Sequence, residues 1–218
     1  MIVSLNTEQT RDLFLFIAKQ MIVHKPLLVE LDSHRGGGAY GVEMAIGFTA
    51  VAEKLLVHKP LHINDIFKTS GVSILTSIGG FSGAIFGTLF LGGVKGMPII
   101  EEMNVKQLAI ILANSLKILK SRGGINRGDQ IIIDAFERAV AAFGYSVKKG
   151  DTLLQALHVA EFGAQESMEK LITNQAGFNS ITLLHEKAFP SQDPGATSVW
   201  LLFKSMREWV ASLENNTW

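Results

Sequence analysis

The feature that most limits how this chain can fold is an uncharged segment, residues 69–94, that is long enough to cross a bilayer. Three of its glycines, Gly79, Gly83 and Gly87, recur at every fourth position, a spacing that lets membrane helices touch. A glycine pair, Gly79 with Gly80, lies in the middle, where it weakens a single spanning helix, and the flanks carry few basic residues. We therefore expect two buried helices that meet at the glycine pair rather than a membrane span.

Most of the remaining sequence carries the start and stop signals of helices. Asn6 followed by Gln9, and Asn104 followed by Gln107, have the spacing of capping boxes. Apolar side chains recur at helical spacing behind each box. The first of these helices should be interrupted at Lys25-Pro26, because proline cannot continue a helix.

Aspartates mark three further helix starts. The helices that they open should run through Ala142, towards Asn174, and from Pro194 across the C-terminal part of the chain, since proline is favoured in a first turn. The aspartates are Asp129, Asp151 and Asp193. With three more helices between residues 41 and 94, the sequence predicts about eight helices in an antiparallel array, so the fold class is all-α.

The composition excludes several classes of function. A chain of 218 residues that is 47% hydrophobic and 18% charged is enough for one large domain, which we place at 1–218. The formal net charge is zero and no run of lysine or arginine occurs, which argues against nucleic acid as a partner. The absence of cysteine excludes disulfides and thiolate chemistry. The first residues lack the basic leader of a secretory signal, so we expect a cytoplasmic protein.

Motifs that carry common catalytic chemistry are missing. The sequence contains no GxSxG, HExxH or Walker-type GK[ST] motif. His58 with His62, and His158 with Glu161, have the spacing of metal ligands on a helix. A zinc site needs three or four ligands that converge, and no supporting cluster is visible. Surface side chains are the simpler interpretation of both pairs.

Four glycine-bearing or capped stretches remain. They read SHRGGGAYG, SIGGFSGAIFGTLF, RGGINRGDQIIIDAF and SQDPGATS. In this order, and over nearly the whole chain, they resemble the L subunit of dihydroxyacetone kinase. The resemblance implies an eight-helix barrel that binds ADP at one end, with ADP or ATP as the cofactor and a K-type subunit as the partner. It leaves a homodimer open and argues further against a membrane span.

The resemblance also implies which residues contact the nucleotide and the metal. The family's GGxSGxxYGTxF pattern is similar to residues 79–90, with Phe86 in place of tyrosine, and its GGxxxGDKTMxDA pattern is similar to residues 123–135. Its QDPGATS is reproduced at residues 192–198. The metal ligand would be Asp32. The nucleotide-binding residues would be Tyr40, Gly41, Val42, Phe81, Ser82, Gly123, Ile132, Ser180, Asp193, Pro194 and Gly195.

The stretch that follows Leu31 departs from the family. The family pattern is LDxxxGDGDHG, in which three aspartates hold two magnesium ions against the nucleotide phosphates. Here only Asp32 is kept, and the other two aspartates fall on Gly37 and Ala39, with the histidine on Tyr40. Magnesium takes hard oxygen ligands, so two ions cannot be held in the family's manner. We expect catalysis at the family's level to be lost, because phosphoryl transfer needs metal ions to neutralise the negative charge that develops on the phosphates.

A second departure concerns the positive charge near the phosphates. The family's KGRxSYLGERS pattern, which precedes QDPGATS, is not kept, and its phosphate-binding arginine falls on Ser180. His34 and Arg35 are added beside the glycines, where they could bind an anionic ligand directly. Two solvated loop side chains explain them equally well.

These departures favour a degenerate L-type subunit that binds nucleotide weakly, without the family's magnesium, and has little or no catalytic activity. In the family, the K subunit holds the ketone substrate covalently on a histidine, so the implied role is regulatory or scaffolding. The alternative is an active phosphotransferase subunit for dihydroxyacetone or a related short ketose, using Asp32 and a ligand such as Glu43. A third hypothesis is a module that binds another small anion through His34 and Arg35. Magnesium dependence separates the last two.

Overall fold

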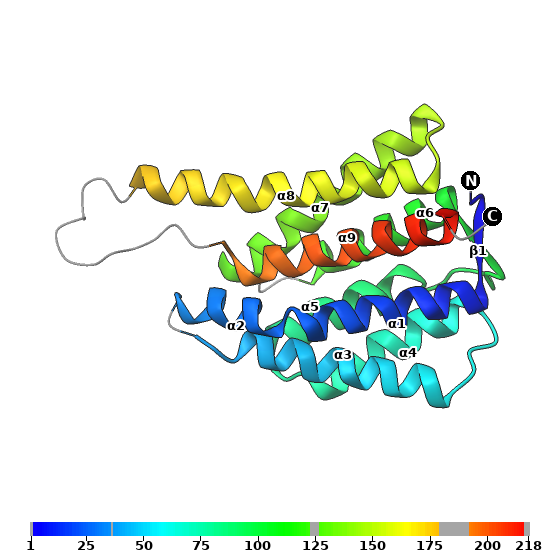
Figure 1. Cartoon of the computed structure of the whole chain (residues 1–218), viewed down its shortest axis with the longest axis horizontal. Coiled ribbons are helices and arrows are strands. Elements are labelled where there is room, and N and C mark those ends of the chain that lie inside the picture. Colours follow the sequence, from blue (N-terminus) through cyan, green and yellow to red (C-terminus); the bar gives the residue numbers. More distant parts are fainter. Residues whose placement is uncertain (1, 36, 123–126, 179–191, 216–218) are drawn as a thin grey trace.

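Nine helices and two short strands form the part of the chain that the computed structural model describes, residues 2–35, 37–122, 127–178 and 192–215 (Figure 1). The strands are β1 (Ser4–Asn6) and β2 (Glu102–Asn104). The helices are α1 (Thr7–Val23), α2 (Lys25–Ser33), α3 (Tyr40–Val57), α4 (Ile63–Ser77), α5 (Gly80–Gly93), α6 (Val105–Ser121), α7 (Arg127–Lys149), α8 (Leu153–Phe178) and α9 (Pro194–Asn215).

Eight of these helices form a closed ring. Each helix from α3 to α9 packs against the next one along the chain, and α1 closes the ring by packing against α3 and α9. Consecutive helices of the ring run in opposite directions (Figure 1). The short helix α2 packs against α3 and α9 at one end. The predicted antiparallel eight-helix barrel is therefore confirmed, with α2 as an addition to it.

The uncharged segment folds as two helices, as predicted. α4 ends at Ser77, and α5 begins at Gly80, whose φ of 67° lies in the left-handed region that glycine tolerates. The two helices then approach closely, because a Cβ built on Gly71 would lie 2.7 Å from the carbonyl oxygen of Gly87. One built on Gly87 would lie 2.3 Å from Leu75 Cγ. Within the described residues, no helix combines the length and apolar character that a membrane span requires.

Aromatic side chains from facing helices fill the inside of the ring. Phe14 on α1 packs edge-to-face on Phe67 of α4, with ring centroids 4.8 Å apart, and lies 5.3 Å from Phe90 of α5. In the other half of the ring, Phe136 on α7 lies 6.0 Å from Phe203 on α9. Such pairs stabilise a core beyond the burial of their area. They fix the helices whose ends form the site.

Both predicted capping boxes are present. Asn6 Oδ1 accepts the backbone N–H of Gln9 at 2.8 Å, and Gln9 Oε1 accepts that of Asn6 at 3.0 Å. Asn104 and Gln107 repeat the arrangement at 3.0 and 2.9 Å. Each asparagine is also the last residue of a strand, so β1 leads into α1 as β2 leads into α6.

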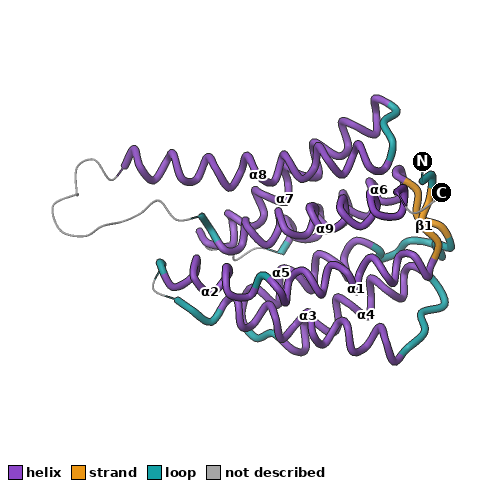
Figure 2. The backbone as a smooth tube through the Cα atoms, in the orientation of Figure 1, coloured by secondary structure: helices purple, strands orange, loops and turns teal. Residues whose placement is uncertain are grey.

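The two strands were not expected from the sequence. They pair antiparallel with Leu5 opposite Met103, and both of these side chains are buried. Both strands lie beside the chain ends (Figure 2), and the backbone N–H of Ile2 donates to Glu214 Oε1 at 2.9 Å. Strands of three residues are too short to show a period-2 pattern, which explains why they were missed.

Two predicted helix starts are displaced. α7 begins at Arg127 rather than after Asp129, and it continues beyond Ala142 to Lys149 because the apolar spacing continues. α8 is capped by Thr152, whose Oγ1 accepts the N–H of Gln155 at 3.3 Å. The neighbouring Asp151 instead accepts a hydrogen bond from Ser146 Oγ.

Candidate functional site

The first turns of α3, α5, α7 and α9 lie at one end of the ring, which is on the left in Figure 1. The four glycine-bearing or capped stretches of the sequence therefore lie at the same end. The strands and both described chain ends lie at the opposite end. We call the end that holds the first turns of α3, α5, α7 and α9 the glycine end.

Asp32 lies in the last turn of α2, and its side chain closes the loop that follows. Its Oδ2 accepts the backbone N–H of Gly38 at 2.5 Å and that of Tyr40 at 3.0 Å. Its backbone carbonyl accepts the N–H of Gly37, and a Cβ built on Gly37 would lie 2.4 Å from Oδ1. The carboxylate thus holds the loop and the start of α3, and a side chain at position 37 would require it to move.

The acidic residues at this loop do not fit a two-magnesium cage. Among the residues that the structure describes, no three His, Cys, Asp or Glu side chains come together as a metal site. Glu43, the alternative acidic ligand, lies in the first turn of α3. Magnesium is usually bound by one or two carboxylates together with substrate phosphates. Here the carboxylate of Asp32 is already the acceptor for two backbone amides.

An ion pair joins this loop to the start of α9. Arg35 Nη1 lies 2.6 Å from Asp193 Oδ2, and the Asp193 side chain is only 7% exposed. The other oxygen, Asp193 Oδ1, accepts the N–H of Ala196 at 2.9 Å, so the predicted helix cap is confirmed. Arg35 therefore has a partner within the chain, although the residue, like His34, is exposed.

A hydrogen bond between side chains joins the same two elements. The Tyr40 hydroxyl donates to Ser198 Oγ at 3.1 Å, and Ser198 Oγ donates to the carbonyl of Pro194 at 2.9 Å. Burial raises the pKa of the Tyr40 phenol, so it stays protonated as a donor at neutral pH.

Several residues expected to bind nucleotide have packing roles. A Cβ built on Gly195 would lie 2.3 Å from Ile132 Cγ1, so α9 passes directly over α7. One built on Gly41 would lie 2.6 Å from the backbone nitrogen of Val29, where α3 passes α2. Ile132 and Pro194 are buried. Packing is therefore enough to explain these residues without a bound nucleotide.

The other expected residues are divided between surface and undescribed positions. Val42 is 38% exposed on the first turn of α3, and Ser82 is half-buried in the first turn of α5. The side chain of Phe81 lies outside the described part of the structure, and so do Gly123 and Ser180. The structure thus brings together Asp32, Tyr40 and Asp193, and it tests none of the expected residues as ligand contacts.

Sequence reasoning missed Arg122, a second arginine at the glycine end. It follows the last residue of α6, and its Nη1 donates to Thr88 Oγ1 and to the carbonyl of Ala84, both on α5. The signal was its place directly before Gly123 in the RGGINRGD stretch. A cation at the C-terminus of a helix is favourable, which explains its position without a ligand.

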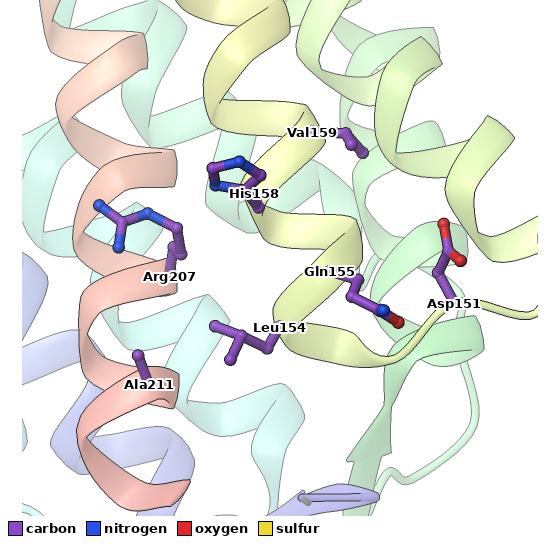
Figure 3. A pocket seen from close by; sticks show the side chains of 7 residues that line it. All are labelled: Asp151, Leu154, Gln155, His158, Val159, Arg207 and Ala211. Atoms are coloured by element: carbon purple, nitrogen blue, oxygen red, sulfur yellow. The ribbon is translucent and has the colours of Figure 1, made fainter. Parts of the chain in front are cut away.

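A cavity lies away from this end, between α8 and α9 (Figure 3). Its volume is about 500 Å³, and Asp151, Leu154, His158 and Arg207 are among its lining residues. Arg207 forms ion pairs with Glu161 and with Glu208, which raise its pKa. The exposed His158 faces this cavity and forms no metal site with Glu161, whose carboxylate binds Arg207.

Comparison with known proteins bears directly on the glycine end. The DAK2 domain family matches residues 36–208, which is most of the chain. The chain belongs to the DAK2 domain family. The PEP-dependent dihydroxyacetone kinase, ADP-binding subunit DhaL, of Escherichia coli (strain K12) is 30% identical over 179 residues, covering 82% of this chain and 85% of that protein. The ADP-binding subunit DhaL of PEP-dependent dihydroxyacetone kinase 1 from Listeria innocua serovar 6a is 29% identical over 183 residues, covering 84% of this chain and 86% of that protein.

Solved structures of a dihydroxyacetone kinase agree with the architecture. The dihydroxyacetone kinase of C. freundii, in complex with AMP-PNP and Mg2+, superposes with a TM-score of 0.65 at 22% identity, covering 95% of this chain. This chain spans about a third of that protein, 35% of its length. The native form gives the same TM-score at 21% identity, covering 91% of this chain and 34% of that one. These structures support the fold, and the family match together with the DhaL relatives confirms the resemblance to the L subunit family.

Proposed function

We propose that this DAK2 chain is an L-type subunit of a dihydroxyacetone kinase that no longer holds magnesium in the family's manner. It binds ADP or ATP weakly, has little or no phosphotransferase activity, and acts beside a K-type subunit as a regulatory or scaffolding partner. The names of its relatives as ADP-binding subunits support the nucleotide and the kinase context.

The observation that carries this proposal is the state of Asp32. Its carboxylate binds the amides of Gly38 and Tyr40, and a side chain at position 37 would collide with it. The positions where the family pattern has its second and third aspartates hold Gly37 and Ala39. Removing the carboxylates that hold magnesium commonly lowers a phosphoryl-transfer rate by several powers of ten, because the metal neutralises the charge that develops in the transition state.

Calorimetric titration of the purified chain with ADP, with and without magnesium, tests the proposal. We expect weak binding that magnesium does not improve. Micromolar affinity that appears only with magnesium, about −8 kcal/mol, would restore the active phosphotransferase and refute the degenerate site.

A pair of matched variants locates any binding that is seen. Ser82→Glu places a carboxylate in the first turn of α5, and Ser212→Glu places one on the exposed side of α9 near the opposite end. Loss of ADP binding only in Ser82→Glu assigns it to the glycine end. Equal loss in both, or in neither, would contradict that assignment.

The partner is tested separately by sedimentation of the chain with a K-type dihydroxyacetone kinase subunit. We expect a complex to form without nucleotide or magnesium, because a scaffolding role needs neither. Co-sedimentation that requires both would instead indicate a catalytic subunit.

A further inference from the structure

The ion pair between Arg35 and Asp193 connects two elements that are far apart in the sequence. Arg35 lies directly after α2, in the loop before α3, and Asp193 caps α9, 158 residues later. The two oxygens of Asp193 have separate partners, since Oδ1 binds the N–H of Ala196 and Oδ2 binds the guanidinium. Asp193 therefore holds the start of its own helix and the loop at the same time.

The loop carries a different charge from the one in the family pattern. That pattern has three carboxylates, which need cations to come together. Here Asp32, in the last turn of α2, and Arg35, in the loop, carry opposite charges. Asp32 satisfies the amides of Gly38 and Tyr40, and Arg35 reaches outwards to α9. No cation from solution is required to bring these groups together.

We propose that Arg35 is a positioning residue that fastens the loop before α3 to the start of α9 without a divalent cation. This inference rests on the proposed loss of the family's magnesium site. It adds that the glycine end is ordered without metal, by a side chain of the chain itself. A planar guanidinium suits this role, because it binds a carboxylate with fixed geometry and stays charged at every physiological pH.

A second link limits the size of the expected effect. The Tyr40 hydroxyl binds Ser198, also on α9, so removing Arg35 should loosen the loop without releasing it. The loop amides of Gly38 and Tyr40 report this loosening, because both are bound by Asp32 and exchange with solvent only when the loop opens.

Amide hydrogen exchange over residues 37–41 of the full chain is the test. In the wild type we expect exchange that neither magnesium nor a chelator alters. Arg35→Gln should accelerate it roughly tenfold, and Arg35→Lys should recover part of the protection. Asp193→Asn keeps an oxygen for the cap of α9 and should match Arg35→Gln. The double variant should then exchange no faster than either single variant, because both remove the same bond.

Arg11→Gln is the matched control. The side chain of Arg11 is 25% exposed, against 27% for the side chain of Arg35, and it pairs with Asp12 on α1 at 2.9 Å. This control should leave exchange over residues 37–41 unchanged. Equal exchange in Arg35→Gln and the wild type, additive effects in the double variant, or slowing of wild-type exchange by magnesium would each overturn the inference.

Failure of the inference is distinguishable from failure of the proposed function. If Arg35→Gln opens the loop and the wild type nevertheless needs magnesium to bind ADP, the fastening role stands and the degenerate site does not. If ADP binding does not depend on magnesium and Arg35→Gln leaves the exchange of the loop amides unchanged, the degenerate site stands and the fastening role does not.

Discussion

Two glycine-rich regions of this chain resemble the same family, but they have different physical reasons to be glycine-rich. On the seam between α4 and α5, a Cβ on Gly87 would collide with Leu75, so the helices need the glycine in order to pack. In the loop before α3, the three atoms nearest to a Cβ on Gly37 all belong to the Asp32 side chain. A Cβ on Gly38 would meet only Ser33 Oγ, at 3.5 Å, and that residue is glycine because its φ is 135°. The seam keeps the family pattern and the loop does not.

The difference indicates how a family motif should be interpreted. A motif that the packing requires is retained whether or not a ligand binds, so the seam and the QDPGATS stretch are weak support for nucleotide binding. No packing contact requires an aspartate at position 37 or 39, so the absence of the family's aspartates there is the informative change. Four variants, described below from the largest expected effect to the smallest, test this contrast.

The largest effect is expected on the seam. Gly87→Ala should lower the free energy of unfolding by about 1–3 kcal/mol, because the added carbon overlaps Leu75. Gly144→Ala, in the middle of α7 with nothing within 4 Å of the new carbon, should raise it by about 0.5–1 kcal/mol. Urea denaturation of both variants measures whether the two changes in the free energy of unfolding have opposite signs. A neutral Gly87→Ala would remove the packing explanation.

The second-largest effect on stability is expected at the cap of α9. Asp193→Ala should lower the free energy of unfolding by about 1–2 kcal/mol through loss of the cap to Ala196. Asp193→Asn should cost less, since its amide oxygen still accepts that hydrogen bond. Equal values for the two variants would mean that the ion pair with Arg35, rather than the cap, carries the effect.

In the loop, Gly37→Ala should have a smaller effect, a loss of about 1 kcal/mol. The new carbon displaces the carboxylate of Asp32 from the amides of Gly38 and Tyr40, but that side chain is short and can move. Thermal unfolding with Asp32→Asn as a comparison checks this mechanism. A loss as large as that of Gly87→Ala would abolish the contrast between loop and seam.

The smallest effect at neutral pH is expected for Tyr40→Phe, a loss of about 0.5 kcal/mol, because one partly buried hydrogen bond to Ser198 is lost. Burial holds the pKa of the Tyr40 phenol above its usual value of 10.0, so its stabilising contribution is complete below pH 10. Above that pH the unfolded chain ionises first and the contribution declines. The gap between wild type and variant should therefore narrow in unfolding curves measured above pH 10. A constant gap would contradict the raised pKa.

Local signals in the sequence were enough to predict most of the fold. The capping boxes at Asn6 and Asn104 and the cap at Asp193 involve neighbours along the chain, so they were readable from residue spacing. The pairing of Leu5 with Met103 depends on residues far apart and on strands too short to form a pattern. It could be found only in three dimensions.

The candidate site was predictable in position but not in its bonding. The sequence indicated that Asp32, Tyr40 and Asp193 belong together, and they lie at one end of the ring. It left Arg35 undecided between an anion ligand and a solvated side chain. The partner that decides the matter is a carboxylate 158 residues away, which no local pattern reveals.

The strand pair has a practical consequence for attaching this domain to something else. β1, β2 and the contact of Ile2 with Glu214 bring both described chain ends together at the end remote from the glycine loops (Figure 2). A tether or surface linker fixed to either terminus would therefore orient the molecule with its glycine end facing outwards. Immobilised chains should present that end to the surrounding solution.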